Sequence, residues 1–308
     1  MSHHRPSDST ETIEYFGFRP PVPRPGNDRS SVRVELAAAS HPGKVRPNNE
    51  DHYLVSRMGR TFQAVSTNMP AGEVPDQVDE VAYGLVVADG MGGMAAGEKA
   101  SQLAIRTGVD LVLNSPLWTT RADEEASRLL IDQLRDYFRR VDRVVIGESR
   151  SDRHLQGMRT TLTVAYLIDA SAIIVHVGDS RAYLFRKGGL RQLTKDHTMA
   201  QGLADAGAIR PEEVQNHAKR HVLINFVGGP TSGVEPEVHN VKLEDGDVLL
   251  LCSDGLSEMV QDAEIATALG REGGVDAVAR SLIELTLDGG GRDNVTVVLA
   301  RIAIVLSP

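Results

Sequence analysis

Acidic residues stand beside glycine at several points where a short apolar run begins or ends. Three pairs fit this description, Asp89-Gly90, Gly178-Asp179 and Asp254-Gly255; Asp293, two positions after Gly291, and Glu50-Asp51 open two further runs. One Asp-Gly pair alone is usually a turn, because both residue types are common in turns. Several carboxylates that converge from rigid strand ends, however, repel one another unless cations lie between them. A ligand set made only of oxygen favours Mg²⁺ or Mn²⁺ over zinc or copper. Two such ions can lower the pKa of a shared water and hold a phosphoryl group for in-line attack.

The composition of the 308-residue chain excludes several other functions. Its net charge is −9 and aromatic residues make up only 4% of it, whereas nucleic-acid binding requires clustered cations and stacking platforms. The single cysteine, Cys252, lies in an apolar run that predicts a buried position. No apolar stretch reaches the ~18 residues of a membrane span, and the N-terminus lacks the apolar core of a signal peptide. We therefore expect a cytoplasmic protein that binds neither nucleic acid nor membrane.

Helical and strand-like patterns alternate from residue 31 onward. Apolar residues at three- and four-residue steps predict helices over 97–113, 122–146 and 274–287. β-rich runs predict strands over 32–36, 83–88, 160–168, 172–177, 182–185, 190–193, 238–241, 248–253 and 294–305. Short turns at 169–171 and 187–189 make the strands on either side antiparallel neighbours, and we expect the same around 244–247. Many hairpins with few helices between them predict an α+β fold rather than a parallel sheet.

Two segments stand apart from this pattern. Residues 1–30 are rich in proline and poor in aliphatic residues, which predicts a mobile tail ahead of a single domain over 31–308. Residues 57–80 contain several glycine, asparagine and proline residues, and these turn formers predict an additional hairpin or loop. The sequence suggests no role for this insertion.

Seven motifs stand in an order that resembles the metal-dependent serine/threonine protein phosphatases of the PPM, or type 2C, family, specifically its bacterial members. They are Gly43–Asp51 (GKVRPNNED), Val87–Gly93 (VADGMGG), Gly157–Thr161 (GMRTT), Val177–Arg181 (VGDSR), Leu193–His197 (LTKDH), Ser253–Leu256 (SDGL) and Arg292–Thr296 (RDNVT). The resemblance covers residues 31–305. It implies two antiparallel sheets packed as a β-sandwich and flanked by helices, with a binuclear metal centre at one end.

The resemblance also implies roles for the acidic residues. Asp89 would bridge two Mn²⁺ or Mg²⁺ ions, and the backbone carbonyl of Gly90 would bind one of them. Asp254 and Asp293 would complete the shell of the other ion. A water or hydroxide between the two ions would then attack the phosphate in line, with Asp89 among the catalytic residues.

Further residues near this centre match the family by position. Glu50 and Asp51 would either hold metal-bound waters or bind a metal directly. Asp179, together with Asp254, would hold the third ion that bacterial relatives often carry. Arg46 would grip the substrate phosphate through its two-pronged guanidinium, and Pro47 would keep Arg46 in an extended backbone conformation.

Residues 199–230 match the variable flap beside the active site, where a protein substrate would be contacted. Two positions depart from the family pattern. Met91 stands where animal members usually carry a histidine that can protonate the leaving group. Glu258 stands where an aspartate is typical. His176, inside a strand, is expected to be a core residue, whereas His197 is equally suited to a structural role at a helix start and to a catalytic one.

The implied activity is hydrolysis of phosphoserine and phosphothreonine in proteins phosphorylated by a serine/threonine kinase. Two alternatives stay open: a catalytically weak, metal-bound regulatory module, and a hydrolase of small phosphate esters. Silent relatives usually lose a metal-binding aspartate, and Asp89, Asp179, Asp254 and Asp293 are all present here. This complete set favours the active enzyme. The physiological substrate, the kinase and the oligomeric state cannot be read from the sequence.

Overall fold

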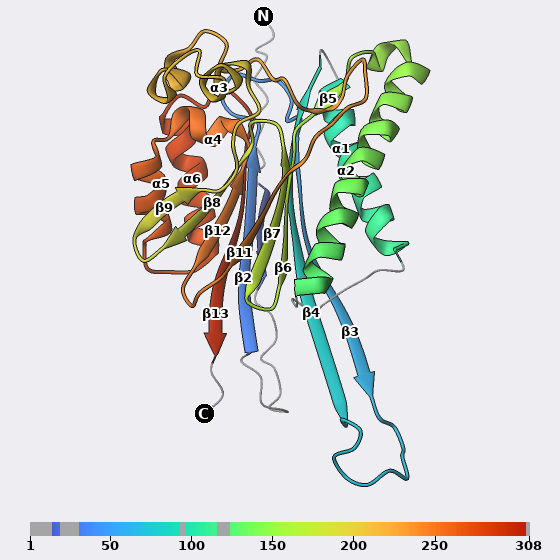
Figure 1. The fold of residues 1–308 in the computed structure, drawn as a ribbon. Helices are drawn as coiled ribbons and strands as arrows, with labels where there is room; N and C mark the ends of the chain where they lie inside the picture. Colours follow the sequence, from blue (N-terminus) through green and yellow to red (C-terminus); the bar gives the residue numbers. More distant parts are fainter. Residues whose placement is uncertain (1–13, 19–30, 93–95, 116–123, 306–308) are drawn as a thin grey trace, which may run out of the picture.

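Two antiparallel sheets pack face to face in the computed structural model, which describes residues 14–18, 31–92, 96–115 and 124–305 (Figure 1). The first sheet has the strand order β1 (Glu14–Phe18), β2 (Ser31–His41), β13 (Val295–Val305), β12 (Val248–Cys252), β8 (Arg181–Arg186) and β9 (Gly189–Gln192). The second has the order β10 (Val227–Gly228), β5 (Arg159–Thr160), β4 (Gln77–Met91), β6 (Leu162–Ile168), β7 (Ser171–Val177) and β11 (Glu237–Lys242). β3 (Asp51–Gln63) pairs with β4 along its whole length.

Helices cover the outer face of each sheet (Figure 1). The second sheet is covered by α1 (Ala96–Leu113) and α2 (Glu124–Ser151), and the first by α4 (Asp254–Met259), α5 (Asp262–Leu269) and α6 (Val275–Asp288). The helix α3 (Met199–Asp205) and the 3-10 helices η1 (Arg153–Leu155) and η2 (Pro211–Asn216) lie in connecting segments. Among the described helices, none is long and apolar enough to cross a membrane.

Strand β12 shows how sheets and helices share the core. Leu249 and Leu251 pack between the two sheets, whereas Leu250 and Cys252 pack under the helices of the first sheet. Because successive strand residues point to opposite faces, a strand covered on both faces must be apolar throughout. The continuous apolar run around Cys252 therefore marks a central strand, and the predicted burial of Cys252 is confirmed.

Most of the predicted elements are present. The three predicted helices are α1, α2 and α6, and the predicted antiparallel pairs are β6–β7 and β8–β9. The predicted insertion at 57–80 is a hairpin, because β3 and β4 stay paired out to Gln63 and Gln77. β6 accompanies β4 only from Ala82 onward, so the outer part is a two-stranded arm that projects from the body (Figure 1).

One expectation is wrong. The strands around 244–247 do not form a hairpin: β11 pairs with β7, whereas β12 pairs with β13 and β8. The connection crosses between sheets because the wholly apolar β12 requires a neighbour on each side, and the half-exposed β11 suits a sheet edge. Within the predicted tail, Glu14–Phe18 form β1 against Leu36–Ser40 of β2. The rest of that tail lies outside the described residues.

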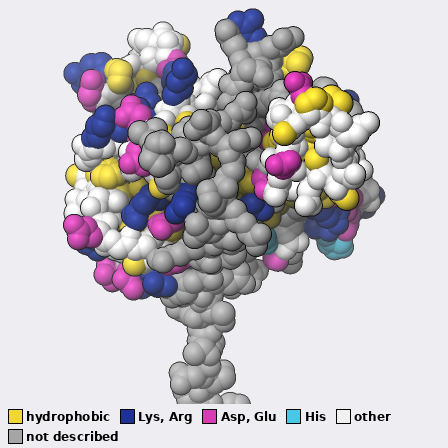
Figure 2. Space-filling model, turned by 90° about the horizontal axis from the view of Figure 1, so that it is seen from below, with side chains coloured by type: hydrophobic (Ala, Val, Ile, Leu, Met, Phe, Trp, Pro, Cys, Tyr) yellow, Lys and Arg dark blue, Asp and Glu magenta, His cyan; other side chains and the backbone are white. Residues whose placement is uncertain are grey.

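The strand ends that carry the acidic motifs all lie at one end of the sandwich, which is the upper end in Figure 1. β3 begins there and β4 ends there, and the starts of β13 and α4 lie beside them. The opposite end, seen in Figure 2, mixes cationic and anionic side chains over its described surface. The topology therefore brings the acidic residues of the motifs together at one end of the sandwich.

Candidate metal centre

Asp51 and Asp89 face each other across the last rung of the β3–β4 hairpin, where they are register partners. Asp254 is the first residue of α4, directly after β12, and Asp293 precedes β13. Asp254 and Asp89 lie close enough for each to influence the pKa of the other. Asp179 follows β7 and interacts electrostatically with both Asp89 and Asp254. The structure thus brings together the carboxylates that the sequence singled out.

The electrostatics of this cluster require positive charge. Burial raises the pKa of Asp51 to about 7, and the nearby carboxylates of Asp254 and Asp293 add to the effect. Burial and Asp293 raise the pKa of Asp254 to about 6. Burial, together with the surrounding carboxylates, also raises the pKa of Asp89 and of Asp179 well above the ordinary value. Without cations these groups would favour the protonated form near neutral pH.

Asp51 provides a direct test of whether the site fits a cation. Its Oδ2 accepts a hydrogen bond of 2.7 Å from Ser253 Oγ, but its buried Oδ1 has no hydrogen-bond partner among the described residues. Such an unpaired buried oxygen is costly unless something binds it. An all-carboxylate donor set with an unpaired oxygen fits Mg²⁺ or Mn²⁺.

The backbone at Gly90 can approach the site only because two glycines face each other. A Cβ at Gly90 would lie 2.1 Å from the Gly97 carbonyl oxygen and 2.8 Å from the Glu50 carbonyl oxygen. A Cβ at Gly97 would lie 2.1 Å from Glu50 Oε2. Side chains at either position would therefore push the start of α1 away from the Gly90 carbonyl and the Glu50 carboxylate.

The backbone of Asp89 is held by the threonine motif of β5. Asp89 N donates to Thr161 Oγ1 at 2.9 Å, and Asp89 O accepts from Thr160 Oγ1 at 2.8 Å. Thr161 Oγ1 also shares a hydrogen bond of 2.8 Å with Ser180 Oγ, next to Asp179. Both threonines are fully buried. The motif at 157–161 thus positions Asp89 and Asp179, a role that its residue types alone did not reveal.

Asn294 and Ser253 position the other side of the cluster, and the sequence reasoning did not identify either. Asn294 Oδ1 accepts from Glu50 N at 2.8 Å, while its Nδ2 donates to the carbonyls of Pro42 and Asn48. Ser253 Oγ accepts from Thr296 N at 2.9 Å while donating to Asp51. A polar residue directly beside each proposed ligand was the available signal, since Asn294 follows Asp293 and Ser253 precedes Asp254.

Arg46 lies on the solvent side of the carboxylates. Its Nη2 donates a hydrogen bond of 2.7 Å to Asp293 Oδ2, and its side chain is 55% exposed. The neighbouring Asp293 and Glu50 raise the pKa of the guanidinium, which is therefore permanently charged. An exposed, charged fork beside a cation site suits a phosphate that arrives from solvent.

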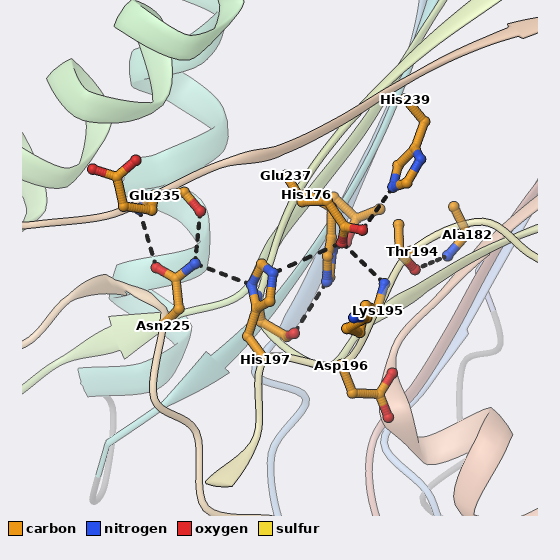
Figure 3. A network of polar contacts seen from close by, with 12 residues as sticks. His176, Ala182, Thr194, Lys195, Asp196, His197, Asn225, Glu235, Glu237 and His239 are labelled. Atoms are coloured by element: carbon orange, nitrogen blue, oxygen red, sulfur yellow. Dashed lines mark hydrogen bonds and ion pairs between the residues drawn. The ribbon is translucent and has the colours of Figure 1, made fainter. Parts of the chain in front are cut away.

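His197 contacts Asn225 of the flap (Figure 3) and also Gly178, the residue before Asp179. Its backbone N donates to Gly178 O at 2.7 Å, and its Nδ1 accepts from Gly178 N and from Asn225 Nδ2. Its carbonyl accepts from Ile224 N at 2.9 Å. Thr198 and Leu223 then form a bridge that closes the two limbs of the flap. These contacts are those of a structural residue.

His176, His197 and Glu237 form a second group of possible metal ligands (Figure 3). Both ring nitrogens of His176 are already engaged, Nδ1 with Thr163 Oγ1 at 2.9 Å and Nε2 with Gly178 O at 3.0 Å. Burial lowers the pKa of His176 to about 3, so the ring is neutral. Glu237 accepts from Lys195 N and contacts His239. The group is a hydrogen-bonded core network, as expected for His176.

The flap carries charged residues that meet α4. It contains α3 and η2, separated by Gly207 in the left-handed region at φ +71°. Beyond η2, His221 Nδ1 lies 3.2 Å from Glu258 Oε1, and Arg220 Nη2 lies 3.7 Å from Glu258 Oε2. The longer carboxylate of Glu258 therefore points to the flap, which the sequence did not predict.

Comparisons with known proteins agree with this site. The profile of the protein phosphatase 2C family matches residues 76–284. The serine/threonine protein phosphatase PstP of Mycobacterium tuberculosis is 38% identical over 278 residues, covering 89% of this chain and 46% of that protein. The serine/threonine phosphatase stp of Listeria welshimeri is 33% identical over 259 residues, covering 84% of this chain and 92% of that protein.

A solved structure of the PstP catalytic domain in complex with two manganese ions is 37% identical, with a TM-score of 0.68. It is matched over 89% of this chain and 100% of its own length. The chain therefore spans about half the length of the mycobacterial relative and all of its solved catalytic domain. The predicted resemblance and the two-sheet fold are confirmed.

Proposed function

Because the chain belongs to the protein phosphatase 2C family, we propose that it is a metal-dependent phosphatase of phosphoserine and phosphothreonine in proteins. The observation that carries this proposal is the cluster of the buried Asp51 with the half-buried Asp89 and Asp254, in which Asp51 Oδ1 has no hydrogen-bond partner among the described residues. The exposed guanidinium group of Arg46 lies on the solvent side of this cluster. A cation site beside an anion-binding fork suits phosphate-ester hydrolysis.

Two Mn²⁺ or Mg²⁺ ions would be held by Asp89, the Gly90 carbonyl, Asp254 and Asp293, with Glu50 or Asp51 as a direct or water-mediated contact. The manganese complex of the PstP catalytic domain supports this metal class. When bound, the ions supply a water of lowered pKa as nucleophile and stabilise negative charge on the phosphate. A third ion at Asp179 and Asp254 is part of the proposal.

The chain's own residues bind and orient the substrate. Arg46 exchanges its contact with Asp293 for two parallel hydrogen bonds to the phosphate oxygens. Thr160 and Thr161 hold the Asp89 backbone, so that its carboxylate keeps one direction. The flap, fastened at His197, contacts the polypeptide around the phosphorylated residue.

The substrates on this proposal are proteins phosphorylated by a serine/threonine kinase. The names of the relatives, PstP and stp, support a protein substrate over a small ester. The complete aspartate set supports catalysis over a silent regulatory module. The boundaries of a single catalytic domain over 31–308 and the cytoplasmic location stay predictions from the sequence.

Phosphate release from a phosphothreonine peptide tests the function. We expect turnover in the presence of Mn²⁺, none with chelator, and none from Asp254→Asn, whose amide cannot replace a charged ligand. Comparison of kcat/KM for the phosphopeptide and for p-nitrophenyl phosphate separates a protein phosphatase from a hydrolase of small esters. Peptide binding without turnover in the metal-loaded protein would instead indicate the regulatory module.

A further inference from the structure

A hollow of about 240 Å³ opens beside the carboxylate cluster, between the flap and α4. Arg220 and His221 of the flap form one wall, and Arg292 forms another. Asp254 and Asp293 form the side that the hollow shares with the cluster. Pockets for whole small molecules usually measure about 300–1,000 Å³. A smaller hollow next to the reacting group is suited to a single side chain of the substrate.

The hollow has a net positive charge when the two proposed metal ligands that line it are not counted. The charges of Asp254 and Asp293 are committed to cations in a metal-loaded enzyme. Of the remaining groups, only Glu258 is anionic, and it faces both Arg220 and His221. Arg292 is exposed and forms no ion pair within the part of the chain that the structure describes. Two guanidinium groups thus stand against one carboxylate, and one of them is free.

The position of the hollow relates it to the phosphate. Asp293 contacts Arg46 at 2.7 Å and also lines the hollow. A phosphate held by Arg46 would therefore lie next to Asp293, with the hollow adjoining the same residue. An extended peptide advances by about 3.3–3.6 Å per residue. A residue one or two positions from the phosphorylated one would bring its side chain to the hollow.

We propose that this hollow is a subsite for an anionic side chain flanking the phosphorylated residue, with Arg292 and Arg220 as its cationic partners. The proposal rests on the phosphatase function proposed above and names its substrate class, acidic phosphopeptides. Glu258 positions Arg220 and His221 at the edge of the hollow and is not itself a partner of the substrate. A carboxylate and a second phosphate share the required chemistry.

Matched phosphothreonine peptides provide the test. They differ at one flanking position at a time, which carries alanine, aspartate, phosphoserine or lysine. We expect aspartate to raise kcat/KM over alanine by about two- to fivefold, the effect of one exposed ion pair, and lysine to lower it. A larger gain from phosphoserine than from aspartate would identify a second phosphate as the preferred occupant, and a larger gain from aspartate would identify a carboxylate.

Variants assign the preference to the hollow. Arg292→Ala combined with Arg220→Ala should bring the ratio of aspartate to alanine peptides close to one. The control is Arg210→Ala, which removes a flap arginine that pairs with Glu213 and does not line the hollow; the ratio should stay as in the wild type. Arg292→Glu should reverse the preference toward lysine, a gain that misfolding cannot produce.

The results that would overturn the subsite differ from those that would overturn the phosphatase function. Turnover of all peptides at equal kcat/KM, or a preference for aspartate that survives in the Arg220→Ala, Arg292→Ala double variant, overturns the subsite alone. If none of the peptides is hydrolysed by the Mn²⁺-loaded wild type, the proposed phosphatase function itself is overturned.

Discussion

The guanidinium of Arg46 donates a hydrogen bond of 2.7 Å to the carboxylate of Asp293, a residue 247 positions later in the chain. The loop before β3 and the turn before β13 are thereby joined across the mouth of the carboxylate cluster. Both side chains are partly exposed, at 55% and 41%, so the pair contributes little to stability. The pair is important because it orients the Arg46 guanidinium beside the proposed metal-binding end of the sandwich.

Arg46→Ala should therefore impair substrate binding and leave stability almost unchanged. We expect KM for a phosphopeptide to rise about tenfold or more, because a hydrogen bond to a charged group contributes about 1.5–3 kcal/mol. Inhibition by inorganic phosphate should weaken in parallel, since the same contact is lost. Arg46→Lys should recover only part of the loss, because an ammonium cannot form the two-pronged contact. Unchanged KM and phosphate inhibition in Arg46→Ala would remove this residue from the site.

Metal removal should abolish activity completely. The proposed ligands are all oxygen atoms, so activity should return with Mn²⁺ or Mg²⁺ and show no specific requirement for Zn²⁺. Asp89→Asn and Asp254→Asn should each abolish turnover while circular dichroism shows an intact fold. The measurement is initial rate against added metal after chelation and dialysis. Full activity in metal-free buffer would contradict the mechanism.

Asp51 should make the metal-free protein less stable as the pH rises. Its pKa is about 7 in the folded chain and about 3.9 in an unfolded one. Between these values the unfolded chain releases a proton that the folded chain keeps, so folding stability is highest below pH 4 for this group and is lost as the pH rises through 7. Each pKa unit corresponds to about 1.4 kcal/mol, so Tm should fall by several degrees from pH 5 to 8.

Asp51→Asn supplies the matched control for this effect. The amide keeps an acceptor for Ser253 but removes the titration, so the metal-free variant should show a flatter Tm profile and exceed the wild type at pH 8. Mn²⁺ should reverse the wild-type trend, because metal ligands must be deprotonated and binding strengthens as the pH rises. A wild-type Tm that rises with pH in the absence of metal would refute the assignment.

The ion pair of Arg186 and Asp247, outside the site, should be costly to break. Arg186 donates to both oxygens of Asp247 at 2.8 and 2.6 Å, and the Asp247 side chain is only 1% exposed. Arg186→Met leaves the buried Asp247 carboxylate without a counter-charge, with Glu244 N still donating to its Oδ2 at 2.7 Å, and should cost about 3 kcal/mol. Lys187→Met, which breaks the exposed neighbouring pair with Glu244, should cost less than about 1 kcal/mol. Denaturant unfolding measures both, and equal losses would contradict the argument.

Local periodicity was sufficient to predict most elements of this fold, because each signal lies within a single segment. The helix α2 and the hairpin β6–β7 are specified by the spacing of their own apolar residues and by one short turn. The error at β11 and β12 arose where pairing depends on remote strands. β12 lies between β8 and β13, and neither partner can be inferred from the turn at 244–247.

The site shows the same division between local and remote information. Acidic residues at the ends of predicted strands indicated which carboxylates meet, as the pairing of Asp51 with Asp89 shows. The residues that position these carboxylates were not predicted. Thr160, Thr161 and Asn294 act through hydrogen bonds to backbone atoms that are distant in sequence. Threonine and asparagine are common everywhere, so only the three-dimensional arrangement reveals their role.

Met91 leads to the last prediction, which concerns the proton for the leaving group. An alkoxide leaving from phosphoserine is a strong base, and a positioned proton donor usually accelerates such a step ~10²–10⁴-fold. Methionine has no proton to give, so the support for the donor must lie elsewhere. Asp179 is the candidate, because it lies half-buried close to Asp89 and Asp254 and is the proposed ligand of a third ion.

Asp179→Ala should therefore reduce kcat for a phosphoserine peptide far more than for p-nitrophenyl phosphate, whose weakly basic leaving group requires little protonation. Met91→Ala should show no such selective loss, because thioether packing does not supply a proton. Measuring kcat on both substrates in both variants decides between donor support and a general structural effect. Equal losses on the two substrates in Asp179→Ala would show that this residue does not support the proton donor, since damage to the metal centre impairs both reactions alike.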